Sequence, residues 1–524
     1  MCSASGGCFE RYKRASRTLG LQRGNKRISI AKTVASKLTS QFAAQARRLR
    51  LLLVAAASIS LALQLLIVNA QNGSEQLTLD TRTHAVQNSI RDATTRPIQD
   101  KNGQIVNVKA FGAVGDGLTN DTEAFNAALK ALADAGGGRC LVPKGTYLIS
   151  ASGITPVHIA AVSSDVHLVG QGRRESVLKI NGMPTNHLLR CDGDKWSVEN
   201  LTFDMGDYTP PKVGFAAIVC RGNNWRVANC AIIKSGKWGI QAYGGSNWSI
   251  EGNYINRTVP GAMPPTGAIL VTAQNGVWPS RGRVSDNVCE GVGISFSGTD
   301  GVIARNRVNR SGSGSGIFVQ GSPSTRSPKI IGNICTGGSS GYDGALGGKW
   351  ASVTGFEIWA PESVICNNVA HDNDAGGIAV GGQNSIVIAN TAYNNGRAHA
   401  GFGGFAARVN PNRGASASHS IFIGNVAYDS RYPSHNATQD YGYVEQNATH
   451  DYGYVGQAAE LTDIKHFGND YKRNRVGPIK SRAPRESATA AQISPEMKSK
   501  LNMLAEDVDL PEKARRAVRE YLSR

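Results

Sequence analysis

Cys191-Asp-Gly-Asp-Lys-Trp-Ser-Val-Glu-Asn200 returns 29 residues later as Cys220-Arg-Gly-Asn-Asn-Trp-Arg-Val-Ala-Asn229. The two stretches match at Cys, Gly, Trp, Val and Asn, which indicates one structural unit per repeat. An Asn after apolar residues recurs nine times, at spacings of 19 to 35 residues, at Asn200, Asn229, Asn253, Asn287, Asn306, Asn333, Asn368, Asn390 and Asn425. Such a period, with one fixed residue per turn, is typical of a solenoid of stacked coils.

The recurring Asn side chains are predicted to be structural. Coils stack at about 4.8 Å, so each amide can bond to the amide or backbone of the next coil. Asn also tolerates the left-handed backbone of a sharp corner. A second phrase precedes most of these residues, at Gly239-Ile-Gln-Ala, Gly293-Ile-Ser-Phe, Gly316-Ile-Phe-Val, Gly355-Phe-Glu-Ile, Gly377-Ile-Ala-Val and Gly404-Phe-Ala-Ala. Two short strands per repeat favour an all-β solenoid of parallel strands.

The positive charge of the chain lies outside the repeats. Of the formal +18, residues 1–70 carry 12 basic residues against one acidic residue. Residues 465–524 carry 14 against eight, which leaves about +1 for residues 71–464. A near-neutral solenoid gives no support to nucleic acid binding, so no nucleic acid partner is predicted.

An apolar run predicts export. Leu51 to Ala70 contains 20 uncharged residues and follows the basic stretch Arg47-Arg-Leu-Arg50. It is long enough to span a bilayer with its basic side in the cytoplasm, and Val68-Asn-Ala70 also resembles a cleavage site. Residues 1–50 are then a cytoplasmic leader, or the true start lies downstream of Met1. Either a signal anchor or a signal peptide places the chain outside the cytoplasm, and membrane contact requires an uncleaved 51–70.

Residues 105–470 open on a specific motif, after a polar linker at 71–104. A strand leads through Phe111-Gly-Ala-Val-Gly-Asp-Gly-Leu-Thr-Asn-Asp-Thr122 into an amphipathic helix with Asn120 or Asp121 at its start, and Val142-Pro-Lys-Gly-Thr-Tyr147 follows. With Val166-His-Leu-Val-Gly-Gln-Gly172, this order resembles the pectate lyase-like superfamily, in its rhamnogalacturonase/epimerase-like branch. The resemblance implies a right-handed parallel β-helix whose first helix caps the N-terminal end of the core.

The end of the repeats contains a tandem duplication. His435–Gln446 and Gln446–Gln457 match at an offset of 11, which predicts one copy as the last strand and one as a loop. In the basic tail, 471–524, Pro495–Leu504 and Pro511–Leu522 predict short helices that either cap the far end or form a simple tail. Cys191 and Cys220 are expected to stack, as a disulfide or, more simply, as buried thiols.

Function must lie on the outside of a packed rod. The resemblance implies a polysaccharide lying along one parallel sheet. If the Gly-Ile strands form that sheet, two outward rows follow, with Gln241, Ser295, Phe318, Glu357, Ala379 and Ala406 in the first and Tyr243, Ser297, Gln320, Trp359, Gly381 and Arg408 in the second. Aromatic rings stack on sugars, and Arg binds uronate carboxylates.

Glu357 is the leading catalytic candidate, because a carboxylate beside the aromatic wall of Trp359 could act as an acid. A plain surface Glu is the simpler interpretation. The segment His371-Asp-Asn-Asp374 could supply a base, or carboxylates for Ca²⁺, although His371, Tyr393 and Tyr428 occupy equivalent corners. Arg408 completes the catalytic set. The predicted substrate-binding residues are Tyr243, Gln320, Trp359, Arg397 and His399.

Two chemistries are open. A lyase or epimerase needs a base and a cation that neutralises the uronate carboxylate. A glycosidase needs two carboxyls, and Glu357 with Asp374 or Asp300 satisfies the spacing of the coils. The motifs of polygalacturonases and the Asp-Pro-His tripeptide of alginate epimerases are absent, so no catalytic residue carries over from an enzyme family. The sequence therefore predicts an exported protein acting on an acidic polysaccharide. The alternative is a non-catalytic glycan-binding or structural scaffold at the cell envelope.

Overall fold

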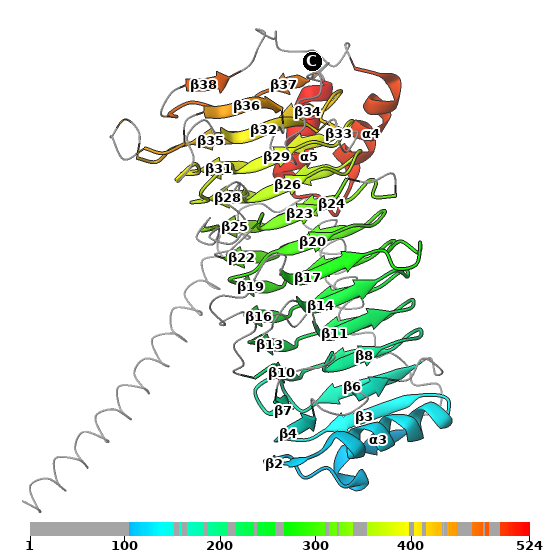
Figure 1. Ribbon diagram of the computed structural model, residues 1–524. Coiled ribbons are helices and arrows are strands. Elements are labelled where there is room, and N and C mark those ends of the chain that lie inside the picture. The colour runs from blue at the N-terminus through cyan, green and yellow to red at the C-terminus, as the bar shows by residue number, and fades with distance from the viewer. Residues whose placement is uncertain are drawn as a thin grey trace, which may run out of the picture. The chain divides into compact units, whose positions relative to one another are not determined.

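Three parallel sheets wind around one core in the computed structural model (Figure 1). The structure describes residues 104–150, 157–159, 165–182, 187–206, 216–234, 238–256, 267–309, 314–321, 324–338, 354–397, 403–410, 415–431, 433, 437–439, 441–447, 464–474, 477–480 and 493–523. Outside these residues lie the predicted leader, Leu51–Ala70, nearly all of the linker, most of the second copy of the duplication, and His399. Among the residues described, no helix combines the length and apolar character needed to cross a bilayer.

Each coil contributes one strand to each sheet, in the order A, B, C. Sheet A consists of β1 (Ile105–Asn107), β3 (Gly138–Val142), β6 (Val166–Gly170), β9 (Ser197–Glu199), β12 (Arg226–Ala228), β15 (Ser249–Glu251), β18 (Arg283–Ser285), β21 (Val302–Ala304), β24 (Lys329–Ile331), β27 (Val364–Cys366), β30 (Ile386–Ile388), β34 (Ile421–Ile423) and β37 (Lys465–Phe467). Sheet B consists of β2 (Asp116–Asn120), β4 (Gly145–Ser150), β7 (Ser176–Asn181), β10 (Thr202–Asp204), β13 (Ala231–Ile233), β16 (Tyr254–Asn256), β19 (Val288–Glu290), β22 (Arg307–Asn309), β25 (Ile334–Thr336), β28 (Val369–His371), β31 (Thr391–Tyr393) and β35 (Val426–Tyr428).

Sheet C is the third side and contains the Gly-Ile strands. It consists of β5 (Val157–Ile159), β8 (Leu189–Cys191), β11 (Ala216–Arg221), β14 (Trp238–Tyr243), β17 (Gly267–Thr272), β20 (Ile294–Phe296), β23 (Ile317–Val319), β26 (Phe356–Ile358), β29 (Ile378–Val380), β32 (Gly403–Asn410), β36 (Tyr441–Asn447) and β38 (Gly477–Lys480). The short β33 (Ala415–Ser416) pairs with β32 antiparallel. This arrangement is consistent with the predicted right-handed parallel β-helix, and β38 continues sheet C past the predicted limit at residue 470.

The Asn ladder exists, but with a different start from the one predicted. From Asn253 to Asn425, each Asn Nδ2 donates to the Oδ1 of the next at 2.9–3.0 Å, and Asn469 extends the series. Asn200 and Asn229 do not belong to it. They sit one position earlier, at corners with φ of 59° and 52°, where later coils have residues such as Gly252. The prediction was wrong for Asn200 and Asn229, because Asn is favoured both in the hydrogen-bonded ladder and at a corner with left-handed backbone.

The first repeat pair aligns as predicted. Trp196, Trp225 and Trp248 stack face to face, with ring centroids 4.9 and 5.1 Å apart. Cys191 and Cys220 are partners in adjacent strands of sheet C, and every described Cys is buried and unbridged. The thiol interpretation is therefore confirmed over the disulfide.

Helices lie at both ends of the chain's described part. After the 3-10 helix η1 (Val108–Phe111), helix α3 (Thr122–Asp134) buries its apolar face in the common core, next to the first coil at the lower end of Figure 1. Asn120 accepts from the backbone N–H of Thr122, whereas the Asp121 side chain is turned to the loop before it. The role of α3 as a cap stays a prediction.

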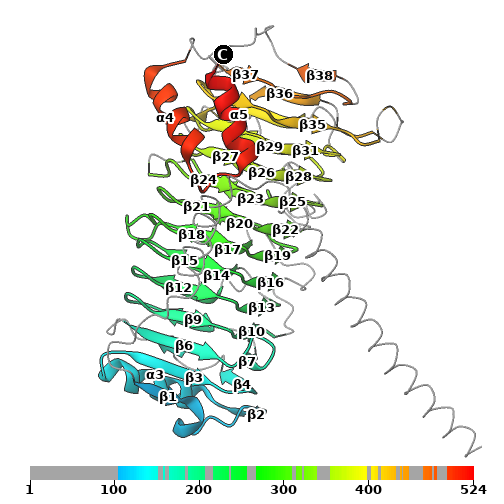
Figure 2. The ribbon, with the colours of Figure 1, turned by 180° about the vertical axis from the view of Figure 1, so that it is seen from behind.

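The C-terminal helices cover a side of the rod. Helices α4 (Pro495–Glu506) and α5 (Glu512–Leu522) pack their apolar faces on the outer side of sheet A, over β27, β30 and β34 (Figure 2). Lys329 forms an ion pair of 2.7 Å with Asp507 at the turn between the helices. They are therefore neither an end cap nor a free tail.

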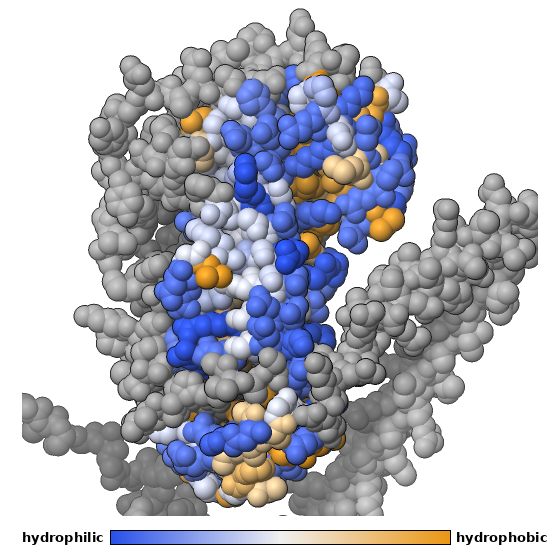
Figure 3. All heavy atoms as spheres, turned by 90° about the vertical axis from the view of Figure 1, so that its right-hand side faces the viewer, coloured by the Kyte–Doolittle hydropathy of each residue, from blue (hydrophilic) through white to orange (hydrophobic). Residues whose placement is uncertain are grey.

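The described surface on the side seen in Figure 3 is largely hydrophilic, with an apolar patch at its lower end. The first coil, which lies at that end, leaves Ile105, Val114 and Leu118 exposed. The core is apolar, and the described part of this face is mostly hydrophilic. The outward polar side chains of each sheet are therefore the places in which to look for chemistry.

Candidate functional site

Sheet C presents the two outward rows that the strand alternation predicts. Phe318, Glu357 and Ala379 are partners in neighbouring strands, and Ser295 and Ala406 continue the row. The prediction left out β17, which adds Leu270 beside Gln241 and Thr272 beside Tyr243. That strand lacks the Gly-Ile phrase, and its own Gly267-Ala-Ile pattern is the signal that could have found it.

Glu357 is the centre of a compact polar cluster on sheet C. Its Oε2 accepts from Ser315 Oγ at 2.7 Å, and its Oε1 accepts from Trp359 Nε1 at 2.9 Å. An Arg408 guanidinium nitrogen lies 3.5 Å from the same Oε1. The structure therefore brings together three of the predicted residues, and it adds Ser315, which precedes β23 and which the sequence reading missed.

The members of this Glu357 cluster come from three coils and differ in exposure. Glu357 and Trp359 belong to the β26 coil, Ser315 to the preceding coil and Arg408 to β32, two coils further on. The Glu357 side chain is 18% exposed, whereas Trp359 and Arg408 are 3% and 6% exposed as residues. Glu357 is thus the more accessible group, held by side chains that are themselves fixed by packing.

Gly381 creates the space for the Trp359 ring. A Cβ on Gly381 would lie 2.0 Å from a ring carbon of Trp359, so the indole crosses this position against the backbone. The indole then points its N–H back to Glu357. The Gly381 position in the second outward row is therefore a structural part of the cluster.

Tyr243 lies on sheet C four coils before Glu357. The Arg221 guanidinium lies 5.6 Å from the Tyr243 ring centre, which is cation–π range, and Arg221 also pairs with Asp192. Beside them, burial and the charges of Arg221 and Arg190 lower the pKa of His187 to about 4, against the opposing hydrogen bond from the Ala216 N–H. His187 is therefore neutral at physiological pH.

Gln320, the other predicted binding residue on sheet C, is exposed beside Trp359 in the second row. Its Oε1 accepts from Ser297 Oγ at 2.9 Å. Asp374 and Arg397 form a separate pair at 2.9 Å, with Asp374 in the turn that leads into β29. Gln320 and this ion pair are thus held by contacts other than those of Glu357.

His371 belongs to sheet B and not to the sheet of Glu357. It ends β28, stacks on Tyr393 with ring centroids 4.7 Å apart, and forms a hydrogen bond of 2.7 Å between its Nδ1 and Asp372 Oδ2. Tyr393 stacks on Tyr428 in turn. The equivalence of these three corners is as predicted, and it makes His371 part of a structural ring ladder.

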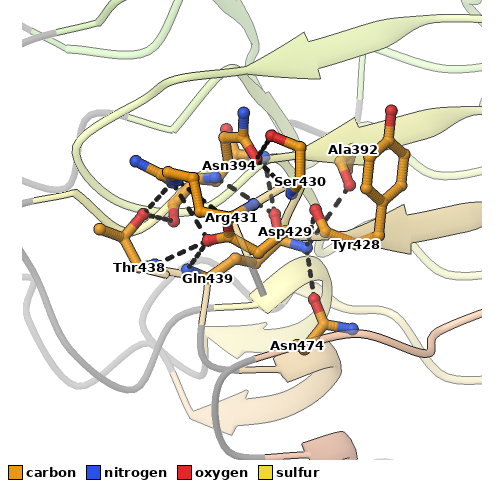
Figure 4. Close-up of polar contacts among 10 residues, drawn as sticks. Ala392, Asn394, Tyr428, Asp429, Ser430, Arg431, Thr438, Gln439 and Asn474 are labelled. Carbon is orange, nitrogen blue, oxygen red and sulfur yellow. Dashed lines mark hydrogen bonds and ion pairs between the residues drawn. The ribbon is translucent and has the colours of Figure 1, made fainter. Parts of the chain in front are cut away.

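A buried carboxylate closes the next coil of sheet B (Figure 4). Asp429 accepts from Arg431 Nε at 2.9 Å and from the backbone N–H groups of Thr438 and Gln439 at 2.6 and 2.9 Å. Burial raises the pKa of Asp429, but the hydrogen bonds from Arg431 and the backbone outweigh it and hold the pKa below its usual value. The contacts tie Arg431, Thr438 and Gln439 to the end of β35, so the cluster is structural.

A second amide ladder runs beside the first. Asn373 donates to Asn395 at 2.9 Å, Asn395 to Gln439 at 3.0 Å, and Gln439 to Asn474 at 2.7 Å. This ladder was not predicted. A regular offset of five residues from Asn368, Asn390 and Asn469 is the signal that could have revealed it.

The described residues contain no group of three or more His, Cys, Asp or Glu side chains arranged for a metal. The predicted Ca²⁺ carboxylates, Asp372 and Asp374, bond instead to His371 and to Arg397. A Ca²⁺ site normally gathers six to eight oxygen ligands. The residues at this corner therefore do not fit a Ca²⁺ site.

Comparison with known proteins agrees with the fold. Residues 105–340 match the family model for rhamnogalacturonase A/epimerase, pectate lyase-like proteins. Mannuronan C5-epimerase AlgE1 of Azotobacter vinelandii is 37% identical over 103 residues, which are 20% of this chain and 7% of that protein. Alginate lyase 7 of the same organism is 37% identical over 105 residues, 19% of this chain and 12% of the relative. The chain thus spans only a small part of these relatives.

Solved structures match over a longer stretch. The A-module of the Azotobacter vinelandii mannuronan C-5 epimerase AlgE4 has a TM-score of 0.58 at 19% identity, covering 74% of this chain and all of that chain. PfbA, a surface adhesin of Streptococcus pneumoniae, has a TM-score of 0.52 at 16% identity, covering 73% and 94%. At these identities the likeness concerns the fold. With the opening motif, the coil topology and the matched family model, the chain belongs to the pectate lyase-like superfamily of parallel β-helix proteins.

Proposed function

We propose that this protein acts on an acidic, uronate-containing polysaccharide that lies along sheet C, with the Glu357 cluster as its reactive centre. The observation that carries the proposal is a partly exposed carboxylate placed within 3.5 Å of a guanidinium and against an indole. Carboxylate, guanidinium and aromatic side chains are the groups that bind and transform acidic sugars. The segments similar to mannuronan epimerases and an alginate lyase support the same substrate class.

The composition of the cluster favours proton abstraction over glycoside hydrolysis. Glu357 faces three donors, Ser315, Trp359 and Arg408, and Arg408 supplies the positive charge that a uronate carboxylate needs beside a base. Inverting and retaining glycosidases need a second carboxyl within about 10 Å, one of them acting as an acid. Glu357 is paired with a cation, Arg408, which suits the removal of a proton next to a carboxylate, so we assign Glu357 the role of a base in place of the acid role expected from the sequence.

In the proposed step, Glu357 removes the proton at C5 of a uronate, next to the sugar carboxylate. The electron pair moves into that carboxylate, where the Arg408 guanidinium offsets the developing charge. In a lyase, the pair then expels the oxygen at C4, which leaves with a proton and gives an unsaturated sugar. In an epimerase, a second donor returns a proton to the other face of C5. The Glu357 cluster is compatible with both outcomes.

The test is turnover of defined polymers. The full chain is incubated with polymannuronate, polyguluronate and polygalacturonate, and unsaturated uronate absorbance, reducing ends and sugar epimers are measured. We expect one of these products from the natural protein and at least about a hundredfold loss in Glu357→Gln, the range typical of a lost general base. Glu290→Gln, on sheet B, is the matched control and should keep full activity. Absence of all three products would refute the enzymatic proposal.

A non-catalytic glycan-binding role is the second candidate. It is favoured by the burial of Trp359 and Arg408, since a purely structural cluster would show the same packing. A binding protein would retain polymannuronate in affinity electrophoresis with no product formed. Its affinity would also be unchanged in Glu357→Gln, because the amide preserves the size of the side chain and can still accept from Ser315.

We also infer export, on the basis of the apolar run Leu51–Ala70 and the basic residues before it. A polymer of uronates is an extracellular substrate, so the location and the activity support each other. Fusion of residues 1–104 to a reporter that is active only outside the cytoplasm tests this. Deletion of 51–70 should abolish the reporter signal, and an unchanged signal would contradict the inference.

A further inference from the structure

A pocket on sheet B lies outside the site already described. It has a volume of about 420 Å³, within the range of about 300–1,000 Å³ typical of small-molecule sites. It opens on the outer face of β7, β10, β13 and β16, along the left edge of Figure 1. Its lining consists of Arg173, Arg174, Val177, Thr202, Ala231, Ile233 and Tyr254.

The hollow results from a small residue between larger ones in one outward row. Val177, Thr202, Ala231 and Tyr254 are successive partners across four strands, so their side chains stand side by side. Ala231 leaves a gap that Thr202 and Tyr254 flank, and Ile233 forms the second part of the floor. Tyr254 is fixed, because Asn256 Nδ2 donates to its hydroxyl at 2.9 Å. The pocket thus has an apolar floor and one rigid aromatic wall.

The rim carries two guanidinium groups. Arg173 and Arg174 are exposed, in the turn that precedes β7, and neither forms an ion pair with any residue that the structure describes. The nearby carboxylate of Asp204 instead lies 3.9 Å from Lys234. The backbone of the turn is tied to the floor, because Thr202 Oγ1 donates to the Arg173 carbonyl. Two exposed positive charges therefore lie at the entrance, in the same turn as the exposed Glu175.

We propose that this sheet B pocket binds one carboxylate-bearing sugar unit of an acidic polysaccharide, apart from the reactive centre on sheet C. The guanidiniums of Arg173 and Arg174 bind the sugar carboxylate, for which their planar donor forks are suited. The apolar floor and the Tyr254 ring pack against the C–H face of the pyranose. The proposal rests on the proposed substrate class but not on turnover. The pocket retains the polymer and does no chemistry.

The test observes Tyr254 directly. The full chain with Glu357→Gln is labelled with fluorotyrosine, and its Tyr254 resonance is assigned as the one absent from Tyr254→Phe. A mannuronate trimer is then titrated. We expect a saturable shift of this resonance, and an affinity at least about tenfold weaker in Arg173→Gln/Arg174→Gln, as for the loss of charge-assisted hydrogen bonds. Arg305→Gln/Arg307→Gln removes two charges at β22 and at the corner before it, outside the pocket, and should leave the affinity unchanged.

Three outcomes would overturn the proposal. The first is a Tyr254 resonance that the trimer does not shift. The second is an equal loss of affinity in both double variants, which would indicate general charge attraction. The third is a shift caused by a sulfated or a neutral trimer but not by the mannuronate trimer. Because binding is read at Tyr254, failure of the pocket is distinguishable from failure of catalysis, which the product assays measure separately.

Discussion

Asn333→Ala tests the physical claim on which the fold depends. The Asn333 side chain is fully buried and makes four hydrogen bonds. Its Oδ1 accepts from the backbone and side-chain nitrogens of Asn306, both at 2.9 Å. Its Nδ2 donates to Ile303 O at 2.8 Å and to Asn368 Oδ1 at 3.0 Å. Alanine at this position removes all four at once and fills none of the space.

The expected cost follows from the groups left behind. The Asn306 backbone N–H, one of its amide hydrogens and the Ile303 carbonyl lose a partner in the interior. Each unsatisfied buried group costs about 1–3 kcal/mol. Asn368 Oδ1 keeps the backbone N–H of residue 333, so it adds little. We therefore expect Asn333→Ala to lower the free energy of unfolding by about 3–9 kcal/mol, a large part of the about 5–15 kcal/mol typical of domains.

Urea unfolding followed by circular dichroism measures this change, and hydrogen exchange locates it in the coils around β22 and β25. The matched control is Asn229→Gly. Asn229 is exposed, at a corner with φ of 52°, and glycine accepts that conformation. Its change should stay below about 1 kcal/mol. If Asn333→Ala were no more destabilising than this control, the amide ladder would not be what holds consecutive coils in register.

Further outcomes follow from individual contacts. Gly381→Ala should displace the Trp359 indole, lower stability by about 1–3 kcal/mol as overpacking does, and change the emission of that Trp. Asp429→Asn should lower the melting temperature most above about pH 4 and converge with the natural protein at lower pH. This is because a depressed carboxylate pKa adds stability that is lost as pH falls through the folded value. Burial raises the pKa of Cys191 and Cys220 far above the ordinary value, so both should resist alkylation at pH 8 until urea unfolds the chain.

The coil architecture was predictable because its signal repeats. Residues spaced by one turn recur many times, so errors in one coil do not hide the pattern in the others. The register at single positions was harder. Asn200 and Asn229 have the right residue type in the right phrase. In the coil of Asn229, however, Cys230 occupies the ladder position. Its backbone N–H donates to Asn253 Oδ1, but its side chain has no amide with which to continue the ladder. Only the backbone angle separates the two roles.

The second ladder escaped for a related reason. Asn373 and Asn395 each follow an Asn of the first ladder by five residues. Gln439 joins the ladder 44 residues after Asn395, so the regular spacing in the sequence is lost. A longer side chain there replaces the Asn that the period would require. Insertions at corners are tolerated in a solenoid because the strands on either side keep their partners. A ladder that crosses such an insertion is therefore regular in the structure but hard to detect in the sequence.

The candidate site shows why the alternation of side chains along a strand predicts on which face a residue lies, but not which residues come into contact. Glu357, Trp359 and Arg408 were placed on one outward face from sequence alone, and they do lie together. Ser315 could not be predicted, because it lies just before β23 and is separated from its partner Glu357 by 42 residues of chain. In a β-helix each coil contributes one or two side chains, and loops of variable length separate them. A reactive centre built in this way has no local motif, so its chemistry is decided by which coils are neighbours and by the small residue, here Gly381, that lets one side chain reach across another.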